Sequence, residues 1–268
     1  MKAQILELLR KYTNHNHIKL TCRGNMAIFF STYFAKKLNS KAYFLVPDEG
    51  GWLTYKTYPK IFNLNVHELK TNNAVIDLDE LKKFAQKSSA LIYSNPGGYF
   101  CEQPMKEIYD ICNNYGCLVI LDASGSIGTE MCKGEYADFI IGSFGKWKPV
   151  NAEYGGFISA KNEFPDLEIF KMDKIDEDKL PTIYEKLKTV SERIKSFINT
   201  AEKVKKDLSN YNILSKESKS INVVIEYNND EEKEKLIKYC TDNEHQYTMC
   251  PRYIRTNLKA ISIEIKRQ

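Results

Sequence analysis

Short apolar runs alternate with longer helix-like segments between Ile18 and Ile158. The runs have the length of buried strands, and Gly, Pro and Asn residues mark the turns between elements. The expected strands are Ile18–Cys22, Ala42–Val46, Leu64–Leu69, Ala90–Tyr93, Cys117–Leu121, Phe139–Ile141 and Gly156–Ile158. The expected helices are Asn25–Leu38, Trp52–Phe62, Asp77–Gln86 and Pro104–Asn114. Alternating strands and helices predict an α/β fold with a mostly parallel sheet flanked by helices.

Two consecutive strands in this set lack a helix between them. No helical segment separates Phe139–Ile141 from Gly156–Ile158. Parallel neighbours need a long crossover connection, whereas antiparallel neighbours do not. We therefore expect one strand here to run antiparallel, which makes the sheet mixed.

The pattern changes after Asn162, where long charged helices and half-buried strands replace the short apolar runs. The expected elements are the helices Leu180–Leu208 and Glu231–Cys240 and the strands Ile221–Tyr227 and Ala260–Ile265. The change predicts a large α/β domain over residues 1–165 and a small α+β C-terminal domain over residues 166–268, with the boundary near Pro165.

The composition is that of an ordinary globular protein, with 43% apolar and 28% charged residues. The net charge of +4 is too small to predict nucleic acid or a membrane surface as the main partner. No run approaches the roughly 18 apolar residues that a membrane span needs. The N-terminus also lacks the pattern of a secretory signal peptide, so we expect a cytoplasmic protein.

The seven cysteines are scattered, with no CxxC and no Cys/His cluster of zinc-site spacing. This spacing predicts no metal site. Cys112 and Cys117 are most simply interpreted as small core residues. Reduced thiols are typical of the cytosol.

Charged residues follow the later strands, at the ends where open parallel sheets bind ligands. Asp122 follows a buried strand, and a carboxylate there needs a partner. A pyridinium N–H, a magnesium ion or a helix N-terminus would each serve. In the loop Gly142–Lys148, a partly desolvated lysine could form a Schiff base. Lys146 and Lys148 are rivals for this role, and a solvated surface lysine is the ordinary alternative.

Three earlier loops add weaker signals. Gly24 before a helix would let backbone N–H groups approach a phosphate, but it also suits an ordinary turn. Trp52 follows two glycines and could lie against a flat ring or simply anchor the core. Asn95 could donate to a ring oxygen or belong only to the turn Asn-Pro-Gly-Gly. Together, an anion loop, a stacking aromatic, an amide, a carboxylate and an amine match pyridoxal phosphate (PLP).

The order of these residues resembles a known superfamily. Val119–Gly128 and Tyr136–Trp147 are similar to the class V pattern of a strand-end Asp, a small-residue loop, a Gly, then Asp-Phe, Ser and Lys-Trp. The chain thus resembles the fold-type I PLP-dependent enzymes of the aminotransferase superfamily, as a class V-like or DegT-like member. Residues 117–160 carry the specific part of the match, and a looser match covers residues 1–165.

The resemblance implies a role for each of these residues. Lys146 would form the Schiff base with PLP and shuttle a proton during the reaction. It is favoured over Lys148 because the spacing from Ser143 and the following Trp both match at position 146. Asp122 would pair with the pyridine nitrogen. The other implied contacts are Gly24, Asn25, Met26 and Ser143 at the phosphate, Trp52 on the ring and Asn95 at the ring hydroxyl.

Some positions depart from the family pattern. Gly125 stands near the place where a Gln or His usually follows the Asp, and Tyr154 lies where an Arg often binds the phosphate. In the family, an Arg of the small domain clamps the substrate carboxylate. Arg252 and Arg255 are the candidates, although both could equally be surface residues.

The resemblance implies a PLP-dependent enzyme that acts on an amino acid or another small amino compound, most simply an aminotransferase. It also implies a homodimer, because the active site in this superfamily forms between two subunits. One alternative is a degenerate cofactor-binding relative with a structural or regulatory role. Another is a cysteine desulfurase or lyase of the same fold, with Cys101 or Cys132 as the nucleophile. An unrelated nucleotide-binding protein would need a Gly-rich fingerprint where only Gly24 stands.

Overall fold

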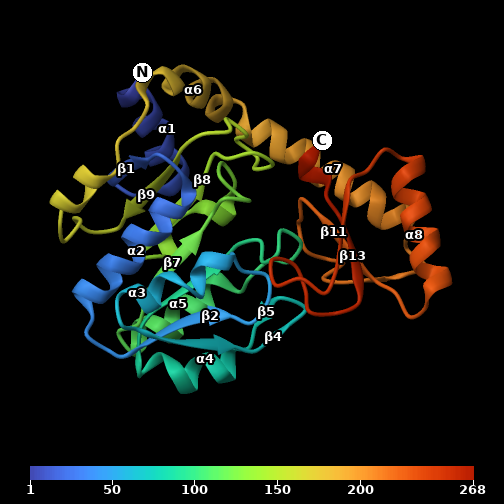
Figure 1. Ribbon diagram of the computed structural model, residues 1–268, viewed down its shortest axis with the longest axis horizontal. Helices are drawn as coiled ribbons and strands as arrows, with labels where there is room; N and C mark the ends of the chain where they lie inside the picture. The colour runs from blue at the N-terminus through green and yellow to red at the C-terminus, as the bar shows by residue number, and fades with distance from the viewer.

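The main sheet has seven strands in the order β1-β9-β8-β7-β6-β2-β3 (Figure 1). In this computed structural model, which describes residues 1–268, the seven strands are β1 (His17–Thr21), β2 (Tyr43–Pro47), β3 (Asn65–Leu69), β6 (Ser88–Ser94), β7 (Leu118–Asp122), β8 (Phe139–Ser143) and β9 (Gly156–Ala160). Strands β8, β7, β6, β2 and β3 are parallel to one another, whereas β9 is antiparallel to both of its neighbours. The prediction of a mixed, mostly parallel α/β sheet is confirmed. The antiparallel strand is β9, which follows β8 without a helix between them.

Helices cover both faces of this sheet because successive side chains of each strand point to opposite faces. In β7, Ile120 packs into the core beneath α2, whereas Val119 and Leu121 pack into the core beneath α5. Both faces are therefore buried, which explains the continuous apolar runs. The helices around the sheet are α1 (Lys2–Thr13), α2 (Gly24–Leu38), α3 (Tyr58–Ile61), α4 (Leu78–Ala85), α5 (Met105–Asn114) and α6 (Leu180–Lys188).

Of two expected helices, one forms with a capping residue and the other is interrupted by a proline. Asp77 caps α4, since its Oδ1 accepts hydrogen bonds from the N–H groups of Asp79 and Glu80 at 2.9 and 3.0 Å. The prediction of one helix over Trp52–Phe62 is wrong. A short 3₁₀ turn is followed by α3, which begins beside Pro59, a residue that has no N–H to continue a preceding helix.

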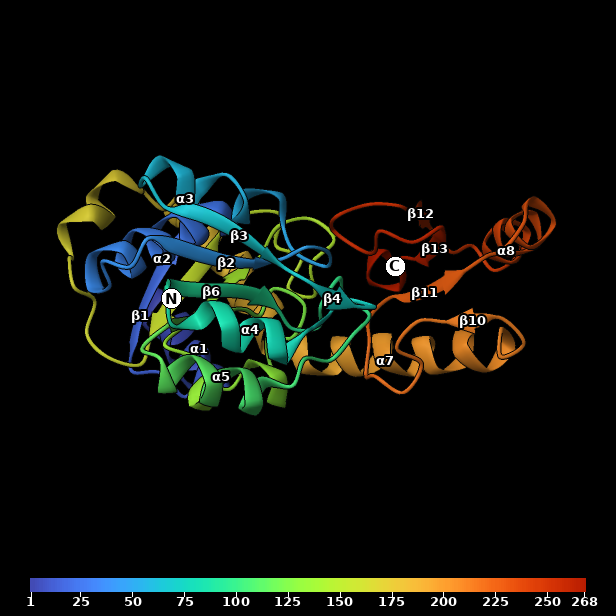
Figure 2. The same cartoon turned by 90° about the horizontal axis from the view of Figure 1, so that it is seen from below.

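The C-terminal part contains a second, antiparallel sheet in the order β10-β11-β13-β12. Its elements are α7 (Val190–Asp207), β10 (Asn212–Ile213), β11 (Val223–Glu226), α8 (Asp230–Asp242), β12 (Tyr247–Met249) and β13 (Ala260–Ile263). Figure 2 shows α7 running from the main sheet to this smaller sheet. The helix expected over Leu180–Leu208 is divided at Thr189 into α6 and α7. The boundary near Pro165 stays a prediction.

The remaining elements are short. They are β4 (Thr71–Asn72), β5 (Val75–Ile76), and the 3₁₀ helices η1 (Leu53–Tyr55), η2 (Glu130–Cys132), η3 (Gly134–Tyr136), η4 (Glu168–Met172), η5 (Glu177–Lys179) and η6 (Ile265–Arg267). No helix combines the length and the apolar character that crossing a membrane requires. All seven cysteines are free thiols.

Candidate active site

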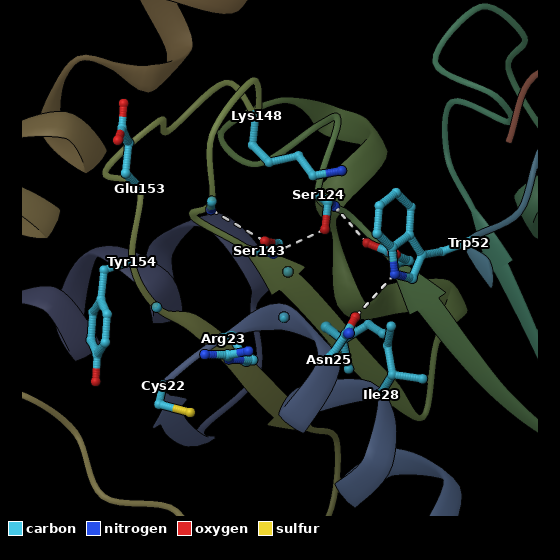
Figure 3. Close-up of a pocket in the computed structure, with 16 residues that line it drawn as sticks. Cys22, Arg23, Asn25, Ile28, Trp52, Ser124, Ser143, Lys148, Glu153 and Tyr154 are labelled. Carbon is cyan, nitrogen blue, oxygen red and sulfur yellow. Dashed lines mark hydrogen bonds between the residues drawn. The ribbon is translucent and has the colours of Figure 1, made fainter. Parts of the chain in front are cut away.

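A cavity of about 280 Å³ lies at the carboxyl ends of β1, β7 and β8 (Figure 3). Its walls come from the loops that follow these strands, from the first turn of α2 and from Trp52. Small-molecule sites commonly measure roughly 300 to 1,000 Å³, so the cavity suits a compact ligand. Its position is the one at which open α/β sheets bind ligands.

The first turn of α2 forms one wall of the cavity. No side chain caps this helix, and its first turn contains no acidic residue, so N–H groups and the positive end of the helix dipole are available to an anion. A Cβ on Gly24 would lie 2.6 Å from Cβ of Ser143, so only glycine lets the helix come this close to the end of β8. The structure thus brings Gly24, Asn25 and Ser143 together, whereas Met26 does not line the cavity.

Asp122 lies at the end of β7 on the cavity wall and is only 7% exposed. Its carboxylate accepts hydrogen bonds from the N–H of Ser124 at 2.9 Å and from the hydroxyl of Tyr55. Burial, together with the negative charge of Asp122, raises the pKa of Tyr55 well above its usual range, so the phenol stays a donor. Both partners are neutral, so no direct contact within the chain pairs this carboxylate with a cation.

Tyr55 did not figure among the candidate residues in the sequence. The available signal was its position three residues after Trp52, on the same side of a helical turn. Trp52 itself is half-buried, and its indole N–H donates to Oδ1 of Asn25 at 3.0 Å (Figure 3). This bond joins the aromatic wall to the start of α2.

The two rival lysines lie in different surroundings. Lys148 lines the cavity, and its Nζ lies 4.8 Å from the centre of the Trp52 ring. Figure 3 shows its side chain extending toward Trp52. Lys146 is exposed, does not line the cavity and lies over the ring of Trp147, with Nζ 5.3 Å from the ring centre.

The backbone between the two lysines explains the difference. Trp147 has a left-handed φ of 63°, and its N–H donates to Oδ1 of Asn151 at 3.0 Å. A left-handed residue turns the chain sharply. The spacing from Ser143 favoured Lys146, but the geometry of this turn favours Lys148.

Asn95 does not lie against the cavity, contrary to the expectation for a residue that reaches a ring hydroxyl. Its Oδ1 accepts a hydrogen bond from the N–H of Gln103 at 3.0 Å, and its carbonyl accepts one from the hydroxyl of Ser126 at 2.6 Å. The alternative interpretation, in which Asn95 serves the turn, fits these contacts.

The two candidate arginines also lie in different surroundings. Arg255 is buried, and its guanidinium donates to both carboxylate oxygens of Glu264, at 2.8 and 2.6 Å. This pairing occupies the fork that a substrate carboxylate would need. Arg252 is exposed, and its guanidinium makes no hydrogen bond or ion pair within the chain. The carbonyl of its neighbour Tyr253 accepts a hydrogen bond of 2.7 Å from the N–H of Gly50, which lies two residues before Trp52.

Glu264 is surrounded by positive charge. Lys266 lies 2.9 Å from its carboxylate and Arg267 lies 3.4 Å away, in addition to Arg255. Burial would raise the pKa of Glu264, but Arg255 and Lys266 outweigh burial and lower it well below its usual range. Burial lowers the pKa of Lys266 to about 7, although Glu264 opposes this shift.

The two cysteines considered as nucleophiles are both fully buried. Burial raises the pKa of Cys101 to about 11 and that of Cys132 to about 12. A thiol is a nucleophile only as the thiolate, so neither residue is poised for attack. No group of three or more His, Cys, Asp or Glu residues is arranged to hold a metal ion.

Two family models match the sequence. Residues 65–178 match the DegT/DnrJ/EryC1/StrS aminotransferase family, and residues 191–268 match the MJ1341 family C-terminal domain. A search of curated proteins finds no match. The first of these regions contains both Asp122 and Lys148.

Solved structures with the same fold cover almost the whole chain. A serine palmitoyltransferase from S. paucimobilis with bound PLP–myriocin aligns over 98% of this chain and 70% of its own, with 13% identity and a TM-score of 0.70. The enzyme from Sphingomonas wittichii gives 11% identity, 97% and 69% coverage and a TM-score of 0.72. An alanine–glyoxylate aminotransferase from Nostoc sp. gives 12% identity, 97% and 80% coverage and a TM-score of 0.71. The chain therefore shares the fold of these three enzymes, and the fold that the resemblance implied is confirmed.

Proposed function

We propose that the protein is a PLP-dependent transferase that acts on a small amino compound, most simply as an aminotransferase. The observation that carries the proposal is the shared cavity of Lys148, Asp122 and the uncapped start of α2. An amine for the aldehyde, a carboxylate for the ring nitrogen and an anion site for the phosphate are the contacts that PLP requires. The family match and the fold support the same cofactor.

The residues of the cavity fit this cofactor. The N–H groups of Gly24 and Asn25 and the hydroxyl of Ser143 would hold the phosphate. Trp52 would lie against the ring, and Asp122 would keep the pyridine nitrogen protonated. When bound, PLP supplies an electron sink for the bonds at the substrate α-carbon.

Lys148 carries the acid–base chemistry of the proposal. Its Nζ would take the proton from the substrate α-carbon and return it to a neighbouring atom. Lys148 is half-buried beside Trp52, which places its amine at the cavity wall and limits its exposure to water.

Arg252 is the better placed of the two predicted arginines to bind a substrate carboxylate. Arg255 is occupied by Glu264, whereas Arg252 has no partner within the chain. Its loop also lies against Gly50 and Gly51, which precede Trp52. The homodimer and the cytoplasmic location remain predictions.

The test is to add PLP to the purified protein, reduce with borohydride and map the modified lysine by mass spectrometry. Borohydride makes a bond between a lysine amine and the cofactor aldehyde permanent. We expect the pyridoxyl group on Lys148, and none on Lys148→Ala. Lys146→Ala is the matched control, because it removes a lysine two residues away in the same loop, and it should be labelled as the wild type is. Labelling at Lys146, or no labelling at all, would overturn the assignment.

A further inference from the structure

Tyr99 is the point at which the small domain meets the loop between β6 and α5. Its carbonyl accepts two backbone hydrogen bonds, both of 3.1 Å, from the N–H groups of Ile221 and Asn222. Its φ of 71° lies in the left-handed region, which is costly for an aromatic residue. Such strain persists only where surrounding contacts impose it, and it gathers at functional sites.

The side chain of Tyr99 contacts the lysine of the candidate site. Its hydroxyl is hydrogen-bonded to Nζ of Lys148. The same Nζ lies 4.8 Å from the centre of the Tyr99 ring and 4.8 Å from that of Trp52. The Nζ of Lys148 is thus held between the hydroxyl of Tyr99 and the ring of Trp52, whose face attracts a cation.

The space that Tyr99 fills is left open by Gly125. A Cβ at position 125 would lie 2.7 Å from Cδ1 of Tyr99, so no larger residue fits there beside the ring. The ring of Tyr99, which comes from a different loop, thus occupies the space beside Gly125.

Further charged groups face Tyr99 from the small domain. Arg255 and Lys266 lie 5.1 and 4.9 Å from the centre of its ring, and both are paired with Glu264. From the large domain, Lys148 and the neutral phenol of Tyr55 face it. Two basic side chains of the small domain therefore lie against the ring whose hydroxyl is hydrogen-bonded to Lys148.

We propose that Tyr99 is a positioning residue for Lys148, and that it makes the orientation of this lysine depend on the docking of the small domain. The inference rests on the proposed function in that Lys148 is taken as the cofactor lysine. The hydroxyl of Tyr99 sets the direction of the Lys148 Nζ. The ring of Tyr99 contacts Arg255 and Lys266, so its position depends on that of the small domain.

The first measurement uses the full-length, cofactor-free protein. A short pulse of a small amine-acylating reagent is followed by mass spectrometry, with exposed Lys146 as the internal reference. In the wild type, Lys148 should react severalfold more slowly than Lys146, because its Nζ is hydrogen-bonded to Tyr99 and the side chain is half-buried beside Trp52. Tyr99→Phe should bring the two rates together, since the hydrogen bond is lost while the ring remains.

The second measurement follows the rate at which PLP becomes fixed to Lys148 under borohydride. Misplacing a reacting group by about 1 Å can slow a reaction by up to about a hundredfold, so we expect Tyr99→Phe to slow the trapping about tenfold. The noncovalent affinity for PLP, measured by dialysis in a Lys148→Ala background, should stay the same with and without Tyr99→Phe. Faster acylation with slower trapping is the signature of lost positioning, because unfolding would abolish PLP binding.

Tyr109 provides a matched control. Its hydroxyl accepts a hydrogen bond from Nζ of Lys161 at 2.8 Å, and that Nζ lies 4.9 Å from its ring, so the pair repeats the Lys148–Tyr99 contact on the surface. Tyr109→Phe should leave both the acylation and the trapping of Lys148 at wild-type rates.

A double-mutant cycle tests the role of the space at Gly125. Gly125→Ala should slow the trapping severalfold, because the new Cβ displaces the ring of Tyr99. In a Tyr99→Gly background, which tolerates the left-handed φ, Gly125→Ala should have no further effect. Equal effects in both backgrounds, or wild-type rates in Tyr99→Phe, would overturn the inference while leaving Lys148 as the cofactor lysine. If the wild type is never trapped at Lys148, the proposed function fails instead.

Discussion

Two buried carboxylates, one in each half of the molecule, are stabilised in opposite ways. Asp122 at the main cavity accepts hydrogen bonds from neutral groups, the N–H of Ser124 and the phenol of Tyr55. Glu264 in the small domain is 1% exposed and is enclosed by Arg255, Lys266 and Arg267. Both carboxylates satisfy the requirement that a buried charge have partners.

The difference between the partners of these two carboxylates distinguishes a structural role from a ligand-binding role. The cations that neutralise Glu264 come from its own chain, so this carboxylate has no remaining use for a ligand. The partners of Asp122 leave its negative charge uncompensated at the wall of a cavity. A buried carboxylate with only neutral partners is a candidate for binding a cation from outside, and the same reasoning excludes Arg255 as a free substrate clamp.

The largest effect should follow from removing the charge of Glu264. Glu264→Gln leaves Arg255, Lys266 and Arg267 without their counter-charge, and breaking such a buried network costs about 3–5 kcal/mol of unfolding free energy. Urea denaturation measures this loss. Glu231→Gln is the control, because its ion pair with Lys235 is exposed on α8 and should not shift the midpoint measurably. Similar shifts in the two variants would contradict the structural role of Glu264.

Asp122→Asn should reduce activity strongly while changing stability little. The amide oxygen can still accept from the N–H of Ser124. The amide NH₂ can donate to the hydroxyl of Tyr55, which is then free to donate to Oγ of Ser94 at 3.1 Å. We therefore expect a stability change of about 1 kcal/mol or less. Activity with PLP should fall by about 10²–10³-fold, because the charge that would face the ring nitrogen in the proposed site is gone. Steady-state turnover of an amino donor and urea denaturation of the same sample measure the two effects. A loss of stability as large as that of Glu264→Gln would erase the distinction between the two carboxylates.

Arg252 and Arg255 extend the comparison to the substrate. Arg252→Ala should leave the unfolding free energy within about 0.5 kcal/mol, since the side chain has no partner. If Arg252 binds the substrate carboxylate, the loss of a charge-assisted hydrogen bond should raise KM about tenfold or more for amino acids, but not for amines that lack a carboxylate. Unchanged KM for both substrate types would remove Arg252 from the site.

The sequence predicts the sheet well because burial on both faces leaves a pattern in every strand. The apolar run before Asp122, for example, identifies both β7 and the position of its terminal carboxylate. Elements whose form depends on one local residue are predicted less well. Pro59, in the first turn of α3, interrupts the expected helix over Trp52–Phe62, and Thr189 divides the one over Leu180–Leu208.

The residues of the candidate site also differ in how well the sequence predicts them. Gly24, Asp122 and Ser143 lie directly at strand or helix ends, so the order of elements suffices to bring them together. The preference between Lys146 and Lys148 depends on the left-handed φ of Trp147, which spacing does not reveal. Tyr99 reaches Lys148 through a loop that the small domain holds in place, and the pairing of Arg255 with Glu264 is likewise a tertiary contact.

Lys266 gives the small domain a pH-dependent stability, because burial beside Glu264 lowers its pKa. The unfolded chain holds the lysine proton up to its ordinary pKa of 10.5, whereas burial lowers the pKa of the folded form to about 7. Between these values the unfolded state binds more protons, so the stability of the folded state rises with pH.

This rise is measurable as a difference between the wild type and Lys266→Met. The unfolding free energy of the wild type should gain about 1 kcal/mol per pH unit relative to the variant between about pH 7 and pH 10, and the difference should level off below pH 7, where both states keep the proton. Lys106→Met, which removes an exposed lysine paired with Asp110, should follow the wild-type profile. A difference that is constant across this range would mean that Glu264 holds Lys266 charged, and the small-domain cluster would then be a fixed ion-pair network whose stability Lys266 does not make pH-dependent.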